Sequence, residues 1–392
     1  MLIVVLLKGV PARTTQVAQV GGVLNREAMD LVLNPHDAKA VEAADFLKRK
    51  VGGKIVALTM GPDMKLIPLM KSLYSAQVMG VDEEYVLSDR KMAGSDTWAT
   101  SYAVSLGVKK LVERHIAPID ELSSTISKSG YSDTVKAKAS SLYRANLLPN
   151  RVYSELPSIK DSVVQRFSEG LISAEQALFE LTDVRASLSR FIIVSGIKTT
   201  DGETGSVGPQ VAEGVSELMG ITVPHATYVE DFDVDDSAKT VTSARRIGRL
   251  VQTLEMNLPS LLTISTEYLP REALAALQPS ARGNNYRGKL LQAQKWTADD
   301  LSANVKQLGL SGSPTIVGTG IDVGKPPVQK FVNQSLVFLK ALSQMEFDGK
   351  KFGPFEKGQL APDLPQPIAD RLRGEGSLGF YTHDMLSEEL FG

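Results

Sequence analysis

Cysteine is absent from this chain of 392 residues, and histidine is scarce. Without cysteine the chain cannot form disulfides, thiolate zinc sites, cysteine-ligated iron–sulfur clusters or a cysteine nucleophile. The four histidines lie far apart, at His36, His115, His225 and His383, which argues against a histidine-rich metal site. We therefore expect no metal centre, and any redox or group-transfer chemistry would need a bound organic cofactor.

An excess of charge of either sign and a long hydrophobic run are also missing. The 43 basic and 45 acidic residues give a net charge of −2, without the positive charge that is typical of nucleic-acid-binding proteins. The apolar stretch at residues 2–7 is interrupted by Lys8, far short of the roughly 20 residues that a membrane span needs. It also lacks the features of a signal peptide. We expect no nucleic-acid partner, no membrane span and a cytoplasmic location.

Short apolar runs alternate with helical patterns through much of the chain. The runs at residues 2–7, 55–59, 85–87 and 191–194 show no polar alternation, which is typical of strands covered on both faces. Helical spacing is found at residues 37–50, 65–79 and 97–114. This order predicts an α/β fold with a mostly parallel, Rossmann-like sheet. Further strands at 226–234, 240–246 and 261–265 have hairpin-like spacing and predict an antiparallel extension of that sheet.

Two segments interrupt this alternation. Residues 115–189 are far longer than an ordinary α/β connection, and helical spacing at 124–148 and 159–181 indicates an inserted helical subdomain. Within it, Ser173 and Gln176 have the spacing of a capping box. The tail is rich in glycine, proline and lysine at residues 347–370, which favours an extended arm.

A glycine-rich segment follows the strand at 191–194 and precedes a helical pattern at 211–219. Glycine allows the backbone to approach an anion closely, and amides at a helix start carry partial positive charge. The composition is therefore that of a phosphate cradle, although a flexible strand–helix turn explains it equally well. It is neither a P-loop nor a G-x-G-x-x-G fingerprint. The segment consists of Thr199, Thr200, Asp201, Gly202, Glu203, Thr204, Gly205, Ser206, Val207, Gly208, Pro209 and Gln210.

Three further turns stand at predicted strand ends or helix starts. Asn34, Pro35, His36 and Asp37 open a helical pattern, and ordinary helix-start preferences explain each of them. The second turn is Met60-Gly61-Pro62, and the third is Gly94, Ser95, Asp96 and Thr97. Ligands of open α/β sheets gather at the carboxyl ends of the strands, so the turns together favour a nucleotide site more than any one alone. Asp231, Asp233, Asp235 and Asp236 are interpreted as solvated side chains near a hairpin turn.

These motifs, in this order, resemble the beta subunit of electron-transfer flavoproteins. The resemblance covers roughly residues 1–113 and 190–342, and its most specific part is Asp-Gly-Glu-Thr-x-x-Val-Gly-Pro at residues 201–209. It also includes Leu7-Lys8-Gly9-Val10-Pro11, Gly22-Val23-Leu24-Asn25-Arg26-Glu27, Asn34-Pro35-His36-Asp37, Met60-Gly61-Pro62, Gly94-Ser95-Asp96-Thr97, Pro270-Arg271 and Gly312-Ser313-Pro314-Thr315.

The resemblance implies an adenine nucleotide alpha hydrolase-like fold and a heterodimer with an alpha subunit that holds its own FAD. In simple carriers of this family the beta subunit binds AMP. In the electron-bifurcating group it binds a second FAD, which takes hydride from NADH and divides the electrons between two acceptors. The Asp-Gly-Glu-Thr and Gly-Ser-Asp-Thr forms look like the bifurcating group, so we expect FAD, with AMP as the alternative. A non-redox ATP-binding regulatory module similar to universal stress proteins is a third possibility.

The family's contacts carry over to named positions. The nucleotide is expected to contact the backbone of Leu6, the side chains of Asn34, His36, Asp37 and Met60, and the loop from Thr199 to Gln210. The turn from Gly94 to Thr97 would lie near the flavin or its pyrophosphate. None of these residues is expected to act as a general acid or base.

The resemblance also implies partners and a division of the chain. Besides the alpha subunit, we expect a dehydrogenase or a quinone- or ferredoxin-linked redox partner. Residues 272–288 lack the basic cluster of the family's usual docking loop, and we expect the insertion and the tail to bind additional subunits. The expected units are a nucleotide-binding α/β domain (1–114 and 190–268), the inserted helical subdomain (115–189), a partner-docking arm and helix (269–345) and a C-terminal extension (346–392).

Overall fold

The computed structural model describes most of the first 315 residues and little beyond them. The described residues are 1–12, 19–20, 23–24, 31–62, 69, 71–73, 75–76, 80–130, 132–147, 163–235, 239–269, 293–315, 346–347 and 350–351. The chain divides into two units, Met1–Thr319 and Gly320–Gly392. In the second unit the described elements are β15 (Glu346–Phe347) and β16 (Lys350–Lys351), which pair antiparallel.

A parallel sheet forms the centre of the first unit, as the alternating pattern predicts. Its described strands lie in the order β14-β7-β6-β1-β8-β13-β9, and each neighbouring pair is parallel. Because β1 and β8 are central, their apolar side chains are buried on both faces. The strands are β1 (Leu2–Leu7), β6 (Lys54–Met60), β7 (Glu83–Leu87), β8 (Phe191–Gly196), β9 (His225–Val229), β13 (Ser260–Ile264) and β14 (Gln294–Trp296).

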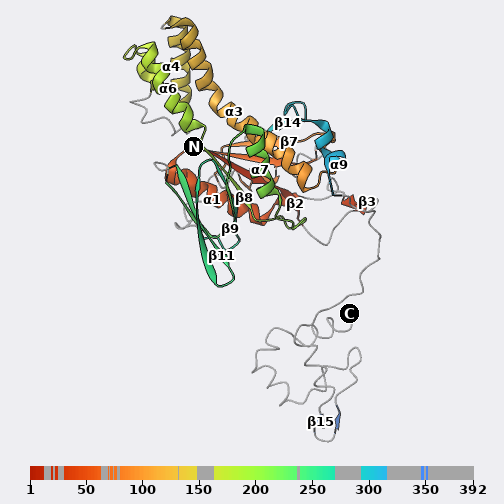
Figure 1. The fold of residues 1–392 in the computed structure, drawn as a ribbon. Coiled ribbons are helices and arrows are strands. Elements are labelled where there is room, and N and C mark those ends of the chain that lie inside the picture. Colours follow the sequence, from red (N-terminus) through yellow and green to blue (C-terminus); the bar gives the residue numbers. More distant parts are fainter. Residues whose placement is uncertain are drawn as a thin grey trace. The chain divides into compact units, whose positions relative to one another are not determined.

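Helices cover both faces of this sheet (Figure 1). On one face α1 (Pro35–Val51) packs with Val5 and Val194 in one hydrophobic core. On the other face α3 (Thr97–Ser129) and α7 (Val207–Met219) share a second core with Val4 and Ile193. The helices expected at 37–50 and 97–114 are therefore confirmed, and α3 runs well past the second range. In the range 65–79, the described residues 69, 71–73 and 75–76 are helical.

The antiparallel part differs in detail from the expected extension of the sheet. The strands β10 (Asp231–Asp235), β11 (Thr240–Ile247) and β12 (Leu250–Asn257) form a separate three-stranded antiparallel sheet. It packs on the α1 side, where the Phe46 and Phe232 rings meet edge to face at 5.6 Å. The run expected at 261–265 belongs instead to β13, which is parallel to β8. This follows from its burial at every position, since a strand inside an α/β sandwich has no solvent face.

A third hydrophobic core lies within residues 119–188. The far half of α3 contributes Ile119, Leu122 and Ile126, and α4 (Asp133–Leu147), α5 (Val163–Ser168) and α6 (Ala174–Leu188) supply the rest. Pro118 separates this half of α3 from the half that packs on the sheet. The predicted capping box is confirmed, because the Ser173 hydroxyl accepts a hydrogen bond from the Gln176 amide and the Gln176 side chain accepts one from the Ser173 amide.

Several smaller elements complete the described chain. They are β2 (Gly9–Pro11), β3 (Gln19–Val20), β4 (Val23–Leu24), β5 (Leu31–Leu33), η3 (Arg90–Met92), η7 (Val305–Gln307) and α9 (Gly309–Gly312). The expectations for Pro270-Arg271, for residues 272–288 and for nearly all of the tail fall outside the described residues.

Candidate functional site

Asn34 connects the start of α1 to the glycine-rich loop. Its backbone amide donates to the Lys8 carbonyl at 3.0 Å, at the end of β1. Its buried side chain donates to the Lys198 carbonyl at 2.9 Å and accepts from the Thr200 amide at 3.3 Å. The side chain makes no capping bond to its own helix. The side-chain amide of Asn34 therefore fixes the loop after β8, a role that the helix-start preferences did not indicate.

The carboxyl group of Asp37 joins the ends of the two central strands. It is 4% exposed and accepts hydrogen bonds from the backbone amides of Lys8 at 2.8 Å and Gly196 at 3.3 Å. Burial raises the pKa of Asp37 to about 7, although bonds from Asn34 and the two backbone amides oppose the rise. Gly196 permits this contact, because a Cβ there would lie 2.6 Å from the Asp37 Oδ1 atom.

Two ion pairs hold the glycine-rich loop. Lys8 pairs with Asp201 at 2.8 Å, and the Asp201 side chain is only 6% exposed. Lys198 pairs with Glu203 at 3.3 Å across the loop. Glu203 and Gly205 both have positive φ angles, which folds the loop back tightly before α7. The loop is therefore an ordered structure tied to β1 rather than a free connection.

His36 lies beside this loop at the first turn of α1. Burial and the nearby charge of Lys198 lower the pKa of His36, against a smaller opposing effect of Glu203. Its Nδ1 atom is buried and has no hydrogen-bond partner. His36 is therefore a neutral ring at neutral pH, with a polar atom free to meet a ligand at the same strand ends.

The start of α7 combines a buried hydroxyl without a hydrogen-bond partner with a closely packed glycine. The Ser195 hydroxyl, at the end of β8, is buried without a hydrogen-bond partner. Gly208, in the first turn of α7, lies against it, since a Cβ at Gly208 would be 3.1 Å from the Ser195 Oγ atom and 2.7 Å from Thr263 Cγ2. Helix-start amides attract anions, and an unpaired buried hydroxyl is costly. Gly208 therefore lets α7 pack closely on β8 and β13, and the Ser195 hydroxyl beside the helix-start amides is a candidate contact for an anion.

The turn from Gly94 to Thr97 has a different setting. The Asp96 carboxylate caps α3 through the Ala99 amide and also accepts from the Thr315 amide, both at 3.0 Å. Although burial raises the pKa of Asp96, these hydrogen bonds hold it below its usual value. The Ser95 hydroxyl accepts from the Gly309 amide at 3.1 Å. Segment 309–315 thus packs on this turn, which joins two stretches that are over two hundred residues apart.

The predicted residues fall into two groups. Asn34, His36, Asp37 and the Thr199–Gln210 loop meet at the ends of β1 and β8, where Leu6 stands in register with Leu58 and Ser195. The turn at residues 94–97 belongs to the α3 start, and its link to the loop is the 3.1 Å hydrogen bond from the Ser101 hydroxyl to the Gln210 side chain. Met60 ends β6 and is partly exposed.

Sequence reasoning did not single out three side chains of this region. Lys8 and Ser195 lie at the ends of apolar runs, where the sequence pattern indicates only the end of a strand. The third side chain is Thr59, which is in register with Leu7 and whose hydroxyl, like that of Ser195, is buried without a partner. A hydroxyl residue closing an otherwise apolar strand, as in Phe191-Ile-Ile-Val-Ser195, is the signal that could have identified Ser195.

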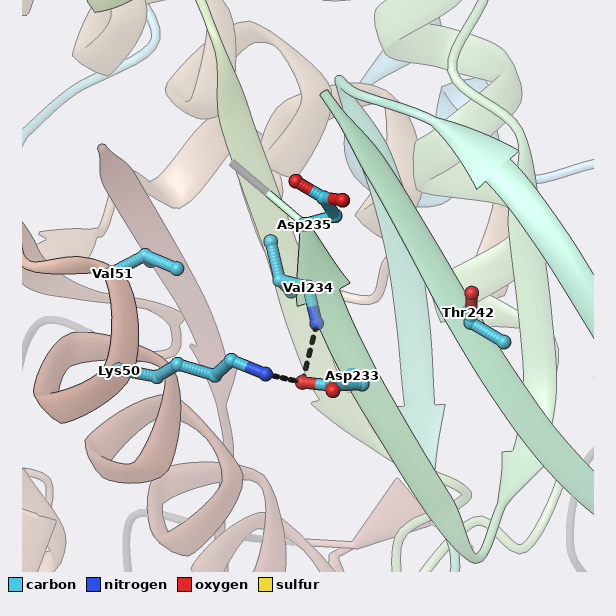
Figure 2. A pocket seen from close by; sticks show the side chains of 6 residues that line it. All are labelled: Lys50, Val51, Asp233, Val234, Asp235 and Thr242. Atoms are coloured by element: carbon cyan, nitrogen blue, oxygen red, sulfur yellow. Dashed lines mark hydrogen bonds and ion pairs between the residues drawn. The ribbon is translucent and has the colours of Figure 1, made fainter. Parts of the chain in front are cut away.

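A hollow of about 400 Å³ lies elsewhere, beside the carboxyl end of α1 (Figure 2). Figure 2 shows Lys50 reaching the Asp233 carboxylate, which also accepts from the Val234 amide. Since Asp37 stands at the opposite end of α1, this hollow is separate from the candidate site.

Two general features were searched for within the described ranges. Every helix there is too short or too polar to cross a lipid bilayer. The same residues include no group of three or more histidine, aspartate or glutamate side chains that could hold a metal ion.

Known proteins similar to this chain point to one family. Residues 21–117 match the family described as the electron transfer flavoprotein domain. The chain is 29% identical to the electron transfer flavoprotein subunit beta of Thermoanaerobacterium thermosaccharolyticum, over 81% of this chain and 86% of that protein. It is 27% identical to the protein FixA of Azorhizobium caulinodans, over 81% and 83%. Subunit CarD of the caffeyl-CoA reductase-Etf complex of Acetobacterium woodii is 25% identical, over 76% and 78%.

Proposed function

The chain belongs to the family of electron transfer flavoprotein beta subunits, and on that premise we propose that it binds FAD at the ends of β1 and β8. Membership supports a role in electron transfer. The finer proposal is that the flavin takes electrons from NADH and that the protein takes part in electron bifurcation.

One observation carries the proposed binding site. The Ser195 hydroxyl is buried, lacks a partner and stands where the first turn of α7 presents Gly208 instead of a larger residue. A phosphate oxygen there would accept the hydroxyl hydrogen and lie against the helix-start amides. The pyrophosphate of FAD and the phosphate of AMP share this chemistry.

The chain's own residues would fix the cofactor rather than react with it. Asn34 and the Lys8–Asp201 pair hold the glycine-rich loop over the strand ends, and Asp37 locks the ends of β1 and β8 together. His36 supplies an unpaired ring nitrogen beside the loop. When bound, FAD supplies the ability to accept a hydride and to release electrons singly, which no side chain of the chain offers.

The preference for FAD over AMP rests on the family forms at two turns. Asp201-Gly-Glu-Thr204 and Gly94-Ser-Asp-Thr97 resemble the bifurcating group. The name of the similar protein CarD places it in a reductase complex, which is consistent with that group. AMP, held only as a structural ligand, is the alternative.

We propose the alpha subunit of the family as the partner, together with a dehydrogenase or a quinone- or ferredoxin-linked redox protein. Residues 115–189 would form a separate helical subdomain that binds a further subunit, in keeping with their own hydrophobic core. The arm at 269–345 and the extension at 346–392 would serve the same kind of docking.

A cofactor count tests the function. The chain is co-expressed with its alpha subunit, the complex is denatured, and the released FAD, AMP and ATP are measured against protein. Two FAD per heterodimer are expected. One FAD with one AMP would favour the simple carrier, and a complex without an adenine nucleotide on this subunit would contradict the proposed site.

A further inference from the structure

Trp98 stands in the first turn of α3 with an exposed indole ring. It is 54% exposed, whereas the other tryptophan of the chain, Trp296, is 5% exposed. Tryptophan side chains are highly buried on average, because the indole ring is large and mostly apolar. Helix-start preferences concern short polar residues and proline, so they do not explain an indole at this position. Neither the core nor the start of the helix therefore accounts for Trp98.

The contacts between α3 and α7 place Trp98 level with the start of α7. The Ser101 hydroxyl donates to the Gln210 side chain at 3.1 Å. One turn later on both helices, Ser105 lies against Gly214, where a Cβ would be 2.5 Å from the Ser105 Oγ atom. The two helices therefore run parallel here. One turn before Ser101 is Trp98, and one turn before Gln210 is the first residue of α7.

The indole ring extends over the rim of the sheet where the glycine-rich loop enters α7. Side chains on an α-helix tilt toward its N-terminus, so the Trp98 side chain leans beyond the start of α3. Segment 304–312 borders it on the other side, because the Asn304 amide donates to the hydroxyl of Tyr102, one turn after Trp98, at 3.0 Å. Packed helices lie about 8–10 Å apart, which brings the indole within reach of a ring attached to the proposed phosphate site.

The backbone that carries Trp98 is firmly held. The Asp96 carboxylate accepts from the amides of Ala99 and Thr315, both at 3.0 Å. The Asp96 amide in turn donates to the Ser313 hydroxyl at 2.9 Å. A side chain on a fixed backbone loses less conformational entropy when it binds a ligand, so Trp98 is preorganised for stacking.

The two sides of the proposed phosphate site offer different contacts to a ring. On the α1 side, the His36 Nδ1 atom is buried without a partner and can hydrogen-bond to the polar edge of a base. On the α3 side, Trp98 offers a flat apolar face. FAD has a ring system on each side of its pyrophosphate, whereas AMP has a ring on one side of its phosphate only. Adenine suits the polar side, and the isoalloxazine ring, which must stay accessible to exchange electrons, suits the open side at Trp98.

We propose that Trp98 stacks on the isoalloxazine ring of FAD and thereby makes this subunit prefer FAD to AMP. This inference rests on the proposed function, which assigns the pyrophosphate to the start of α7. AMP brings no ring to the α3 side, so the stacking strengthens the binding of FAD alone.

The test compares two substitutions of Trp98 with a control. Phe179→Leu changes another exposed aromatic side chain, 76% exposed on α6, and serves as the control for Trp98→Leu. Binding of FAD and of AMP to each full-length chain is measured by titration calorimetry. Trp98→Leu should raise the Kd for FAD about tenfold or more and leave the Kd for AMP unchanged. Trp98→Phe keeps an aromatic face and should have a smaller effect, and the control should change neither Kd.

The fluorescence of bound FAD gives a readout that a purely structural role of Trp98 would not change. An indole in contact with the isoalloxazine ring quenches its emission, because the excited flavin takes an electron from the indole and returns it without emitting light. Bound FAD should therefore be dark in the unaltered chain and in Phe179→Leu. It should become severalfold brighter in Trp98→Phe, since a phenyl ring is a much poorer electron donor, although most of the affinity is kept.

The heterodimer with the alpha subunit allows the same comparison in the assembled protein. The FAD and AMP released on denaturation are counted against protein. The heterodimer with Trp98→Leu should release one FAD fewer than the unaltered heterodimer, with AMP in its place.

Several results would overturn the inference while the proposed function stands. They are an unchanged FAD affinity and emission in both Trp98 variants, an equal loss of FAD and AMP affinity, and a Trp98→Leu heterodimer that keeps both FAD. Weaker binding of the alpha subunit with unchanged FAD emission would likewise make Trp98 a protein contact. If Trp98→Leu does not fold, Trp98→Phe decides, because bound FAD that stays dark contradicts stacking. If neither the unaltered chain nor its heterodimer binds FAD at this subunit, the proposed function fails first and this inference fails with it.

Discussion

At the scale of single residues, Asp37 connects the fold to the candidate site. Its carboxyl group is shared by the amides of Lys8 and Gly196, so it determines how closely the ends of β1 and β8 approach each other. The sequence placed Asp37 among the nucleotide contacts, and the structure gives its oxygens to the backbone. We therefore expect Asp37 to affect binding by shaping the strand ends.

The raised pKa of Asp37 makes stability depend on pH. The folded chain holds the proton of Asp37 more tightly than the unfolded chain, so protonation of Asp37 stabilises the fold. This contribution is complete below about pH 4 and is lost as the pH rises to about 7. The shift from 3.8 to about 7 corresponds to a loss of about 4 kcal/mol. In Asp37→Asn this dependence should disappear.

Urea unfolding of both proteins at pH 4.5, 6 and 7.5 checks the prediction. The relevant quantity is the difference in the free energy of unfolding between the two proteins. Burial lowers the pKa of His115 to about 4, which makes the stability of both proteins rise with pH over the same range, and the difference removes this effect. If the difference in the free energy of unfolding stays constant with pH, the raised pKa of Asp37 is contradicted.

Ser195 should show opposite effects on stability and on binding. Ser195→Ala removes a buried hydroxyl without a partner, so the free energy of unfolding of the ligand-free chain should rise by about 1 kcal/mol. Adenine nucleotide affinity should fall about tenfold or more, since a hydrogen bond to a charged group is worth about 1.5–3 kcal/mol.

Ser260 offers a matched control for this prediction. Its hydroxyl is also buried without a partner, but it lies at the opposite end of the sheet, in the first position of β13. Ser260→Ala should stabilise the chain and leave nucleotide affinity unchanged. Equal effects of the two substitutions on affinity would remove Ser195 from the site.

At the scale of elements, the sequence predicted what periodicity and local preferences determine. Buried runs such as Leu2–Leu7 and the capping box at Ser173 depend on neighbouring residues, and both were identified. Pairing between distant strands is not encoded locally, which is why β13 was assigned to an antiparallel extension. The same limit applies to Asn34, whose side chain bonds to Lys198 and Thr200 instead of capping its helix.

The helical region should be dispensable for nucleotide binding. Its core, from Ile119 to Leu188, is separate from the two cores that flank the sheet. Replacing residues 119–186 by a short glycine–serine linker should therefore leave the adenine nucleotide content of the complex unchanged, as measured by chromatography of the denatured protein.

A variant within the region covers the case of a deletion that does not fold. Phe167→Ala empties part of the third core, where this side chain is 1% exposed, and should lower the stability of that region by about 3–5 kcal/mol. Nucleotide content should again be unchanged. Loss of the nucleotide from a folded variant would show that the helical region supports the site.

At the scale of the whole molecule, we propose that the chain combines a nucleotide-binding sheet with surfaces for other proteins. The rim between β1 and β8 is the proposed phosphate site, while the β11–β12 hairpin extends away from the sheet (Figure 1). A carrier subunit needs both, because its cofactor must be held firmly while its partners supply and remove electrons.

The position of the phosphates in the loaded heterodimer tests the central claim most directly. A crystal structure of the complex should show phosphate oxygens within about 3 Å of the Ser195 hydroxyl and of the amides that begin α7. An adenine nucleotide whose phosphates lie elsewhere on this subunit, with the Ser195 hydroxyl still unpaired, would contradict the account.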